Sequence, residues 1–198
     1  MSPEEQPRPV LPTGYTIRAL RADDAPAMAA AYLRNRDHLE QWDPTRDPSF
    51  YTVAGQQDAI DRQLSLVHGG LLGAWVVVCG EEIVGRANLN NVIRGVLCSA
   101  AVGYWVDHDH LRRGLASAAV EHACAEALDM GLHRVEAGTM VHNLASQRVL
   151  LRAGFEQYGM APRFLFIAGG WQDHNLYQRI LHDDPLPVAP AGTGGAGG

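Results

Sequence analysis

The sequence predicts a single folded domain of the α/β or α+β class, in which helices lie against a sheet. A chain of 198 residues is long enough to bury one apolar core. Segments with the two-residue period of strands and segments with the 3.6-residue period of helices both occur, and the two kinds alternate only in the second half of the chain. Both ends, 1–13 and 183–198, have the proline- and glycine-rich composition of tails, so the domain is expected over residues 14–182.

One strand, two helices and an antiparallel meander are expected in the first half of the domain. The segment YTIRAL, residues 15–20, predicts a strand. Residues 22–35 predict a helix, because aspartates can cap its first turn and its proline sits early enough to be tolerated. A second helix is expected over 54–70, where a glycine pair suits the C-cap. From 71 to 107, β-branched residues and two tight turns predict three antiparallel strands.

The second half alternates helices with strands. Residues 115–130 carry one apolar stripe at helical spacing, with polar residues elsewhere, which predicts an amphipathic helix. A strand is expected over 133–140, a helix over 143–153, and a closing pair of strands over 155–181 that turns at Gly169–Gly170. The expected order is therefore strand, two helices, three strands, helix, strand, helix and two strands.

The composition excludes several classes of function. The formal net charge is −6, whereas nucleic-acid binders held by bulk electrostatics carry a basic excess. Direct nucleic-acid binding is therefore not expected. No apolar run approaches the roughly 18 residues of a membrane helix, so membrane binding is not expected either. The three cysteines are far apart and lie in apolar runs, which favours a cytoplasmic location without a disulfide framework or a metal site. The segment DHDH, 107–110, is interpreted as a solvated loop rather than as metal ligands.

The stretch HLRRGLASA, 110–118, predicts a local anion site. A strand ends near Asp107 and a helix begins at Gly114, so several unpaired backbone N–H groups meet there. Helix N-termini attract anions, Gly114 allows close approach of the backbone, and Arg112 and Arg113 add positive charge. The arrangement suits a pyrophosphate. From these residues alone, a solvated arginine pair on an ordinary loop is the alternative.

The sequence RRGLA before a helix, followed by a strand and NLASQRVLLRAGF, resembles the acetyl-CoA-binding core of the GNAT superfamily of N-acetyltransferases. In that family a loop of the form (Q/R)-x-x-G-x-(G/A) binds the cofactor pyrophosphate; Gly114 and Ala116 match its last two fixed positions, and Leu111 departs from the first. Further segments resemble the RimJ-type branch, which acetylates the N-terminal alanine of a small-subunit ribosomal protein: 35–47, 90–95, 100–106, 142–146, 153–159 and 169–177. The resemblance implies a mixed, strongly twisted sheet, splayed between its fourth and fifth strands, with helices on both faces.

The same resemblance implies acetyl-CoA as the cofactor and assigns residues to its binding. The acyl-pantetheine arm is expected between the fourth and fifth strands, bonded to the backbone near Tyr104 to Val106. Asn143 would bond the pantetheine and Ser146 would protonate or hydrogen-bond the departing thiolate, although both residues also suit the capping of a helix. The residues implied in cofactor binding are Tyr104, Trp105, Val106, Arg112, Arg113, Gly114, Leu115, Ala116, Ser117, Asn143, Ser146, Arg148 and Arg152.

A second group of residues is expected to bind the acceptor. Its members are Asn35, Trp42, Arg46, Arg94 and Tyr104. Trp42 either fixes its loop to the core or forms a wall of the substrate site. Arg148 and Arg152 lie four apart on one helical face, so they either hold the phosphates of CoA or form a solvated charged face.

The sequence does not assign a general base. The region that carries a carboxylate in RimL-type relatives is apolar here, and Tyr158 stands where many relatives have glutamate. Water relayed from Tyr104, Glu136 or Asp173 is left open, and Asp173 also suits a structural role in the last hairpin. The leading hypothesis is direct transfer of acetyl from acetyl-CoA to the N-terminal amine of a protein, by a monomer or a homodimer. The alternatives are transfer to a small-molecule amine and a catalytically silent acyl-CoA-binding regulator.

Overall fold

The computed structural model describes residues 9–185, and the expected tails, 1–13 and 183–198, lie mostly outside this range. The helices and strands of the described chain are β1 (Tyr15–Ala19), α1 (Ala25–Arg34), α2 (Arg36–Leu39), α3 (Val53–His68), β2 (Gly73–Cys79), β3 (Glu82–Ile93), β4 (Ser99–Val106), α4 (Leu115–Asp129), β5 (Arg134–Met140), α5 (Leu144–Arg152), β6 (Glu156–Ile167) and β7 (Gly170–Ile180). The predicted order is confirmed. The four-residue helix α2 was not predicted, because one turn is too short to show a helical period.

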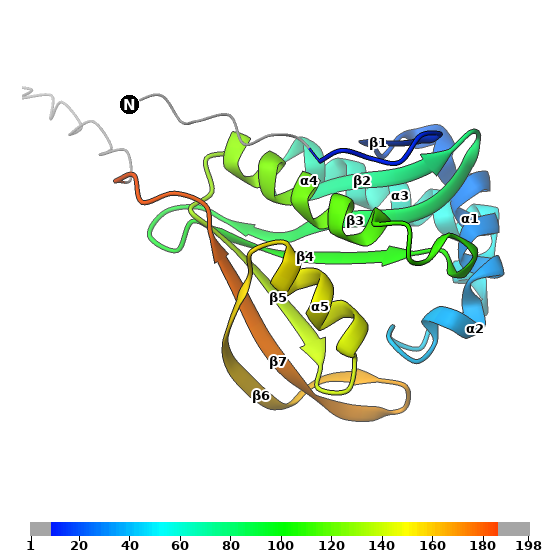
Figure 1. Ribbon diagram of the computed structural model, residues 1–198. Helices are drawn as coiled ribbons and strands as arrows, with labels where there is room; N and C mark the ends of the chain where they lie inside the picture. Colours follow the sequence, from blue (N-terminus) through cyan, green and yellow to red (C-terminus); the bar gives the residue numbers. More distant parts are fainter. Residues whose placement is uncertain (1–8, 186–198) are drawn as a thin grey trace, which may run out of the picture.

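The strands form one mixed sheet in the order β1-β2-β3-β4-β5-β7-β6 (Figure 1). The pairs β1–β2, β2–β3 and β3–β4 are antiparallel, as expected for the meander. The pair β4–β5 is parallel, because the chain crosses over through α4 between these strands. The last two strands form an antiparallel hairpin, and β7 inserts between β5 and β6.

The sheet opens between β4 and β5. These strands are in register only at Ser99–Arg134, Ala100–Val135 and Ala101–Glu136. Beyond these pairs β4 continues to Val106 and β5 to Met140, and the two strands diverge (Figure 1). The predicted splay between the fourth and fifth strands is therefore confirmed, and the edge of β4 that faces the gap is left for another partner.

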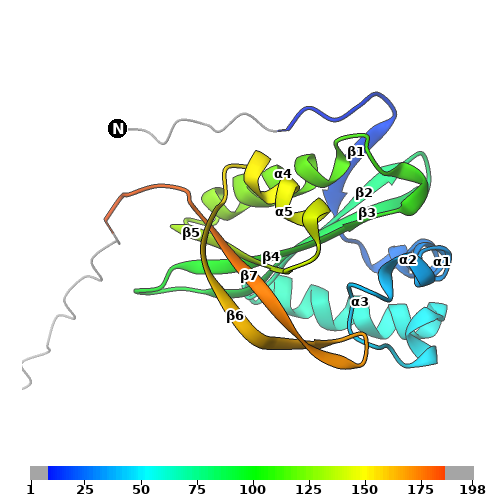
Figure 2. The same cartoon turned by 60° about the horizontal axis from the view of Figure 1, so that its bottom comes forward.

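Helices cover both faces of the sheet, as the resemblance implies. The helices α4 and α5 lie on one face and α1 and α3 on the other (Figure 2). Each face has its own apolar cluster, one built from α4, α5 and the central strands and one from α1, α3 and the first strands. Within the described residues, no helix is both long and apolar enough to cross a membrane.

Candidate active site

A cleft of about 600 Å³ opens at the carboxyl ends of β4 and β5. Four segments meet there: the end of β4, the loop leading into α4, the first turns of α5, and the segment around α2. The lining residues are His38, Leu39, Gln41, Trp42, Tyr104, Trp105, Val106, His110, Leu111, Arg112, Gly114, Leu115, Ala116, Ser117, Asn143, Ala145, Ser146, Val149 and Arg152. Most residues predicted for cofactor binding lie in this set.

The loop 111–117 gives the cleft an anion-binding end. Gly114 is the N-cap of α4 and has a φ of 78°, in the left-handed region that glycine adopts without strain. A Cβ at Gly114 would meet no atom within 4 Å, so its surroundings are open. Because the first amides of α4 have no partner inside the helix, this end can donate several hydrogen bonds to a phosphate. The residues present therefore fit the pyrophosphate of CoA.

The two arginines of this loop differ in position. Arg112 lines the cleft, with a φ of 59°. Arg113 lies outside the lining, because its guanidinium donates to the Tyr15 hydroxyl at 3.0 Å and to the Asp109 carbonyl at 3.5 Å. The expectation that Arg113 contacts the cofactor is not supported by this placement. Leu111 lines the cleft, so an apolar side chain stands where relatives place Gln or Arg.

A hydrogen-bonded pair spans the cleft between β4 and α5. The hydroxyl of Tyr104 lies 2.8 Å from Oγ of Ser146 and 3.2 Å from the Ser146 carbonyl oxygen. Burial raises the pKa of Tyr104 to about 12, despite the opposing hydrogen bond with Ser146. Tyr104 is therefore protonated at neutral pH and can supply a proton or a hydrogen bond, but it is not a base.

Asn143 has a capping role in the structure. Its Oδ1 accepts a hydrogen bond from the backbone N–H of Ser146 at 3.1 Å, which satisfies one of the free amides of α5. Asn143 also lines the cleft, so capping holds its side chain at the edge of the expected pantetheine path.

The segment around α2 forms the opposite wall of the cleft and supplies residues that the sequence did not single out. His38, Leu39 and Gln41 line the cleft beside Trp42. The Trp42 ring lies 5.5 Å from the ring of His142, so it both contacts the β5–α5 loop and walls the cleft. Burial, followed by the charge of nearby His108, lowers the pKa of His38 below its usual value of 6.5. These three residues fall in the segment 35–47 that carried the resemblance, which was the available signal.

Asn35 is a structural residue, contrary to its predicted acceptor role. It is fully buried, and its Nδ2 donates to Asp107 Oδ2 at 2.8 Å and to the Ala31 carbonyl at 2.9 Å. Its Oδ1 accepts from the backbone N–H of His108 at 2.8 Å. These bonds tie the end of α1 to the loop after β4, so Asn35 supports the cleft without lining it.

The segment 107–110 is only partly a solvated loop. Asp107 is fully buried, and Arg34 Nε donates to its Oδ2 at 2.7 Å. The backbone N–H of Asp109 donates to its Oδ1 at 3.0 Å. Burial alone would raise the pKa of Asp107, but the hydrogen bonds from Asn35, Asp109 and Arg34 outweigh it and hold the pKa below its usual value. Both carboxylate oxygens of Asp107 thus accept hydrogen bonds from the protein, so the role of Asp107 in the segment 107–110 is structural.

Three other arginines lie away from the cleft lining. Arg94 donates to the Met130 carbonyl at 2.6 Å, at the C-terminal end of α4, about 22 Å along a helix of 15 residues from the loop 111–117. Its predicted acceptor role is therefore not supported. Arg46 pairs with Asp43 at 3.1 Å and lines a separate small pocket. Arg148 is exposed outside the lining, whereas Arg152 lines the cleft.

The candidate carboxylates have structural partners. Glu136 forms an ion pair with Arg134, whose guanidinium also lies over the Tyr158 ring, 5.0 Å from its centroid. Oδ1 of Asp173 accepts from the backbone N–H of Arg163 at 2.7 Å, in the irregular part of the β6–β7 hairpin, as its structural interpretation predicts. Within residues 9–185, the cleft lining contains no carboxylate.

A mixed sheet that opens between parallel β4 and β5, with an anion-binding helix N-terminus beside the opening, defines an acyl-CoA-binding transferase. Residues 15–156 match the family model described as the acetyltransferase (GNAT) domain. The chain therefore belongs to the GNAT family and is an N-acetyltransferase, and acetyl-CoA is its acetyl donor.

Bacterial N-acetyltransferases are similar to this chain over most of its length. The chain is 34% identical over 175 residues to the probable N-acetyltransferase YjcK of Bacillus subtilis (strain 168). The matched residues are 85% of this chain and 94% of that protein. The chain is also 33% identical over 167 residues to the ribosomal protein uS5-alanine N-acetyltransferase of Escherichia coli (strain K12), covering 81% of this chain and 84% of that protein.

Solved structures of ribosomal-protein acetyltransferases have the same fold as this chain. The ribosomal-protein-S5-alanine acetyltransferase from Vibrio fischeri matches with a TM-score of 0.83 at 31% identity, over 87% of this chain and 96% of that one. RimJ of Mycobacterium smegmatis in complex with CoA-disulfide matches with a TM-score of 0.80 at 30% identity, over 84% and 81% of the two chains.

Proposed function

We propose that this acetyltransferase acts on the N-terminal α-amine of a protein, in the manner of the ribosomal-protein-alanine enzymes, and that it does so in the cytoplasm. The observation that carries the proposal is the 33% identity to the Escherichia coli ribosomal protein uS5-alanine N-acetyltransferase over 81% of the chain. The cleft agrees with this assignment, because its lining joins the anion-binding loop to the separate wall around α2, where an acceptor can approach.

The residues of the cleft have distinct proposed tasks. The amides of the loop 111–117 and the Arg112 side chain hold the pyrophosphate, and Arg152 faces the nucleotide phosphates. The free edge of β4 near Tyr104 to Val106 hydrogen-bonds the pantetheine arm. Acetyl-CoA supplies an acetyl group activated as a thioester. Such a cleft contributes by holding this group close to the amine.

The pair formed by Tyr104 and Ser146 is proposed to handle the leaving group. Ser146 Oγ donates a hydrogen bond or a proton to the departing thiolate, and Tyr104, which stays protonated, orients this hydroxyl through their 2.8 Å contact. The serine then regains a proton from solvent.

Proton removal from the amine needs only a weak base. An α-amino group has a pKa of about 7.7–8.0, so a fraction of the order of one tenth is already neutral at pH 7. His38 is the proposed acceptor for the remaining proton, because it lines the cleft and its lowered pKa keeps it neutral at pH 7. This role replaces the carboxylate that the lining lacks within residues 9–185.

The test is an acceptor panel assayed by thiol release. Purified protein and acetyl-CoA are mixed with an alanine-starting peptide, with the same peptide blocked at its N-terminus but carrying an internal lysine, and with small amines that include aminoglycosides. Mass spectrometry of the product locates the acetyl group. We expect acetylation of the α-amine alone. Release only with small amines would replace the proposal with small-molecule acetylation, and tight acetyl-CoA binding without release would favour a regulator.

A further inference from the structure

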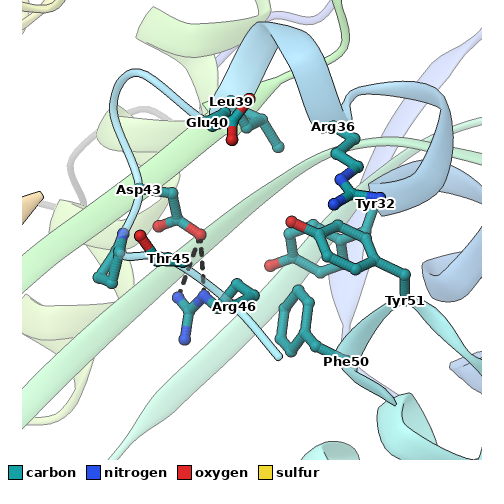
Figure 3. Close-up of a pocket in the computed structure, with 10 residues that line it drawn as sticks. Tyr32, Arg36, Leu39, Glu40, Asp43, Thr45, Arg46, Phe50 and Tyr51 are labelled. Atoms are coloured by element: carbon teal, nitrogen blue, oxygen red, sulfur yellow. Dashed lines mark hydrogen bonds and ion pairs between the residues drawn. The ribbon is translucent and has the colours of Figure 1, made fainter. Parts of the chain in front are cut away.

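A second, smaller pocket lies beside the cleft, between α1, α2 and the loop that follows them (Figure 3). Its volume is about 50 Å³, enough for a group of a few atoms. The lining residues are Tyr32, Arg36, Leu39, Glu40, Asp43, Pro44, Thr45, Arg46, Phe50 and Tyr51. Leu39 lines both cavities, and Trp105, which lines the cleft, donates from Nε1 to the hydroxyl of Tyr32 at 3.2 Å. The pocket and the cleft therefore share a wall.

The hydroxyl of Tyr32 presents a hydrogen-bond donor to this pocket. Its oxygen accepts from Trp105 Nε1 and, at 3.5 Å, from Nη1 of Arg86. A phenol oxygen has two acceptor positions and one proton, so both acceptor positions are used and the proton needs an acceptor of its own. The hydroxyl points into the pocket, as does that of Tyr51 (Figure 3). These hydroxyl groups can therefore donate hydrogen bonds to an acceptor group in the pocket.

The charge behind Tyr32 favours an anion. Arg86 is buried, and its other partners are the neutral side chains of Gln63 and Asn88. In the described part of the chain, no carboxylate forms an ion pair with Arg86. A buried cation without a counter-charge is costly, and its field extends through the polarised Tyr32 hydroxyl into the pocket.

The cations of the pocket rim add to this field. The guanidinium of Arg36 lies over the ring of Tyr51, 4.8 Å from its centroid, and no ion pair engages it within residues 9–185. Arg46 is already neutralised by Asp43. Glu40 also lines the pocket and opposes an anion; like Arg36 it is exposed, so solvent screens its charge. The charges of Arg36 and Glu40 are screened alike, so buried Arg86 is the uncompensated charge that lies behind the pocket.

We propose that this pocket binds the carboxylate side chain of an aspartate or glutamate close to the N-terminus of the acceptor. The proposal rests on the proposed function, because it names a specificity site for the same peptide acceptor. An extended peptide advances about 3.3–3.6 Å per residue. Leu39 lines both cavities, so the pocket adjoins the cleft, and we expect a side chain at position two, three or four of the acceptor to reach it.

The experiment compares glutamate with glutamine in otherwise identical peptides. Alanine-starting peptides carry Glu or Gln at position two, three or four, and kcat/KM is measured at saturating acetyl-CoA. We expect Glu to be preferred over Gln about tenfold at one position, as for one hydrogen bond to a charged group. Arg36→Gln, which changes an exposed side chain, and Tyr32→Phe should each reduce this ratio towards one. Arg94→Gln is the matched control, because it removes a distant arginine, and it should keep the ratio.

The outcomes separate the two proposals. Equal acetylation of Glu and Gln peptides by the wild type at all three positions would overturn the pocket proposal and leave the proposed function intact. A preference that survives both Arg36→Gln and Tyr32→Phe would also overturn it, since the preference would then arise elsewhere. If no peptide is acetylated while acetyl-CoA still binds, the proposed function fails and the pocket proposal falls with it.

Discussion

Gly114→Ala tests the anion-binding loop, and the chain contains its own control. Gly114 and Gly131 stand at opposite ends of α4 with φ values of 78° and 72°. At both positions a Cβ would meet no atom within 4 Å, so alanine is not excluded by contacts inside the protein. Both substitutions therefore carry the same backbone strain, and only Gly114 lies in the cleft lining.

The two variants should be destabilised alike. An L-residue in the left-handed region costs about 1–2 kcal/mol, and the lower entropy of the unfolded alanine chain offsets part of this. A net loss of about 1 kcal/mol corresponds to a fall in Tm of about 2–4 °C for a domain of this size. Binding should separate them, because Gly114 lines the cleft and Gly131 does not, so only the methyl group at 114 enters space that the cofactor would use. Loss of one charge-assisted hydrogen bond, about 1.5–3 kcal/mol, weakens CoA binding about 10- to 100-fold.

Thermal melts and isothermal titration calorimetry with CoA measure the two effects separately. We expect similar Tm values for both variants, unchanged CoA affinity for Gly131→Ala, and a Kd raised at least tenfold for Gly114→Ala. Equal CoA affinity in the two variants would refute the placement of the pyrophosphate at Gly114.

Three further predictions concern the walls of the cleft. Ser146→Ala should lower kcat about 100-fold with little change in the KM for acetyl-CoA, and Tyr104→Phe should act in the same direction; an unchanged kcat in single-turnover kinetics would leave Ser146 a structural partner of Tyr104. In the wild type, Tyr104 ionises near pH 10 when unfolded and near pH 12 when folded, so stability is lost over that range. Urea melts should show a fall of about 2–3 kcal/mol that Tyr104→Phe lacks, and identical pH profiles would contradict it. Asn35→Ala should reduce the free energy of unfolding by about 2–4 kcal/mol, because it removes one donor to buried Asp107 and the acceptor of the His108 N–H; a raised acceptor KM at unchanged stability would restore its acceptor role.

Local patterns were enough to predict the elements of the fold except the one-turn helix α2. The tight turns and β-branched runs of 71–107 indicated the meander, and the apolar stripe of 115–130 indicated α4. The opening between β4 and β5 has no local pattern, because it depends on how two strands separated by a helix are paired. It was expected only through the family resemblance.

The candidate site was predicted where function follows from backbone position. The loop 111–117 depends on a glycine at a helix start, which is visible in the sequence. The roles of Asn35 and Arg94 depend on contacts with residues far along the chain, Asp107 and Met130, and residue type alone does not report these contacts. His38 was overlooked for the same reason, since its place in the cleft follows from the position of the short helix α2.

Within residues 9–185, β4 pairs with β5 only at Ser99–Arg134, Ala100–Val135 and Ala101–Glu136, so we expect the two halves of the sheet to twist against each other more easily than in a fully paired sheet. A ligand lodged between the strands contacts both halves and restricts this motion, with an entropic cost. We therefore expect the stiffness of the sheet centre to affect how tightly the enzyme retains CoA after each turnover. Substitutions near Ala101, distant from every reacting atom, can for this reason alter the rate of product release.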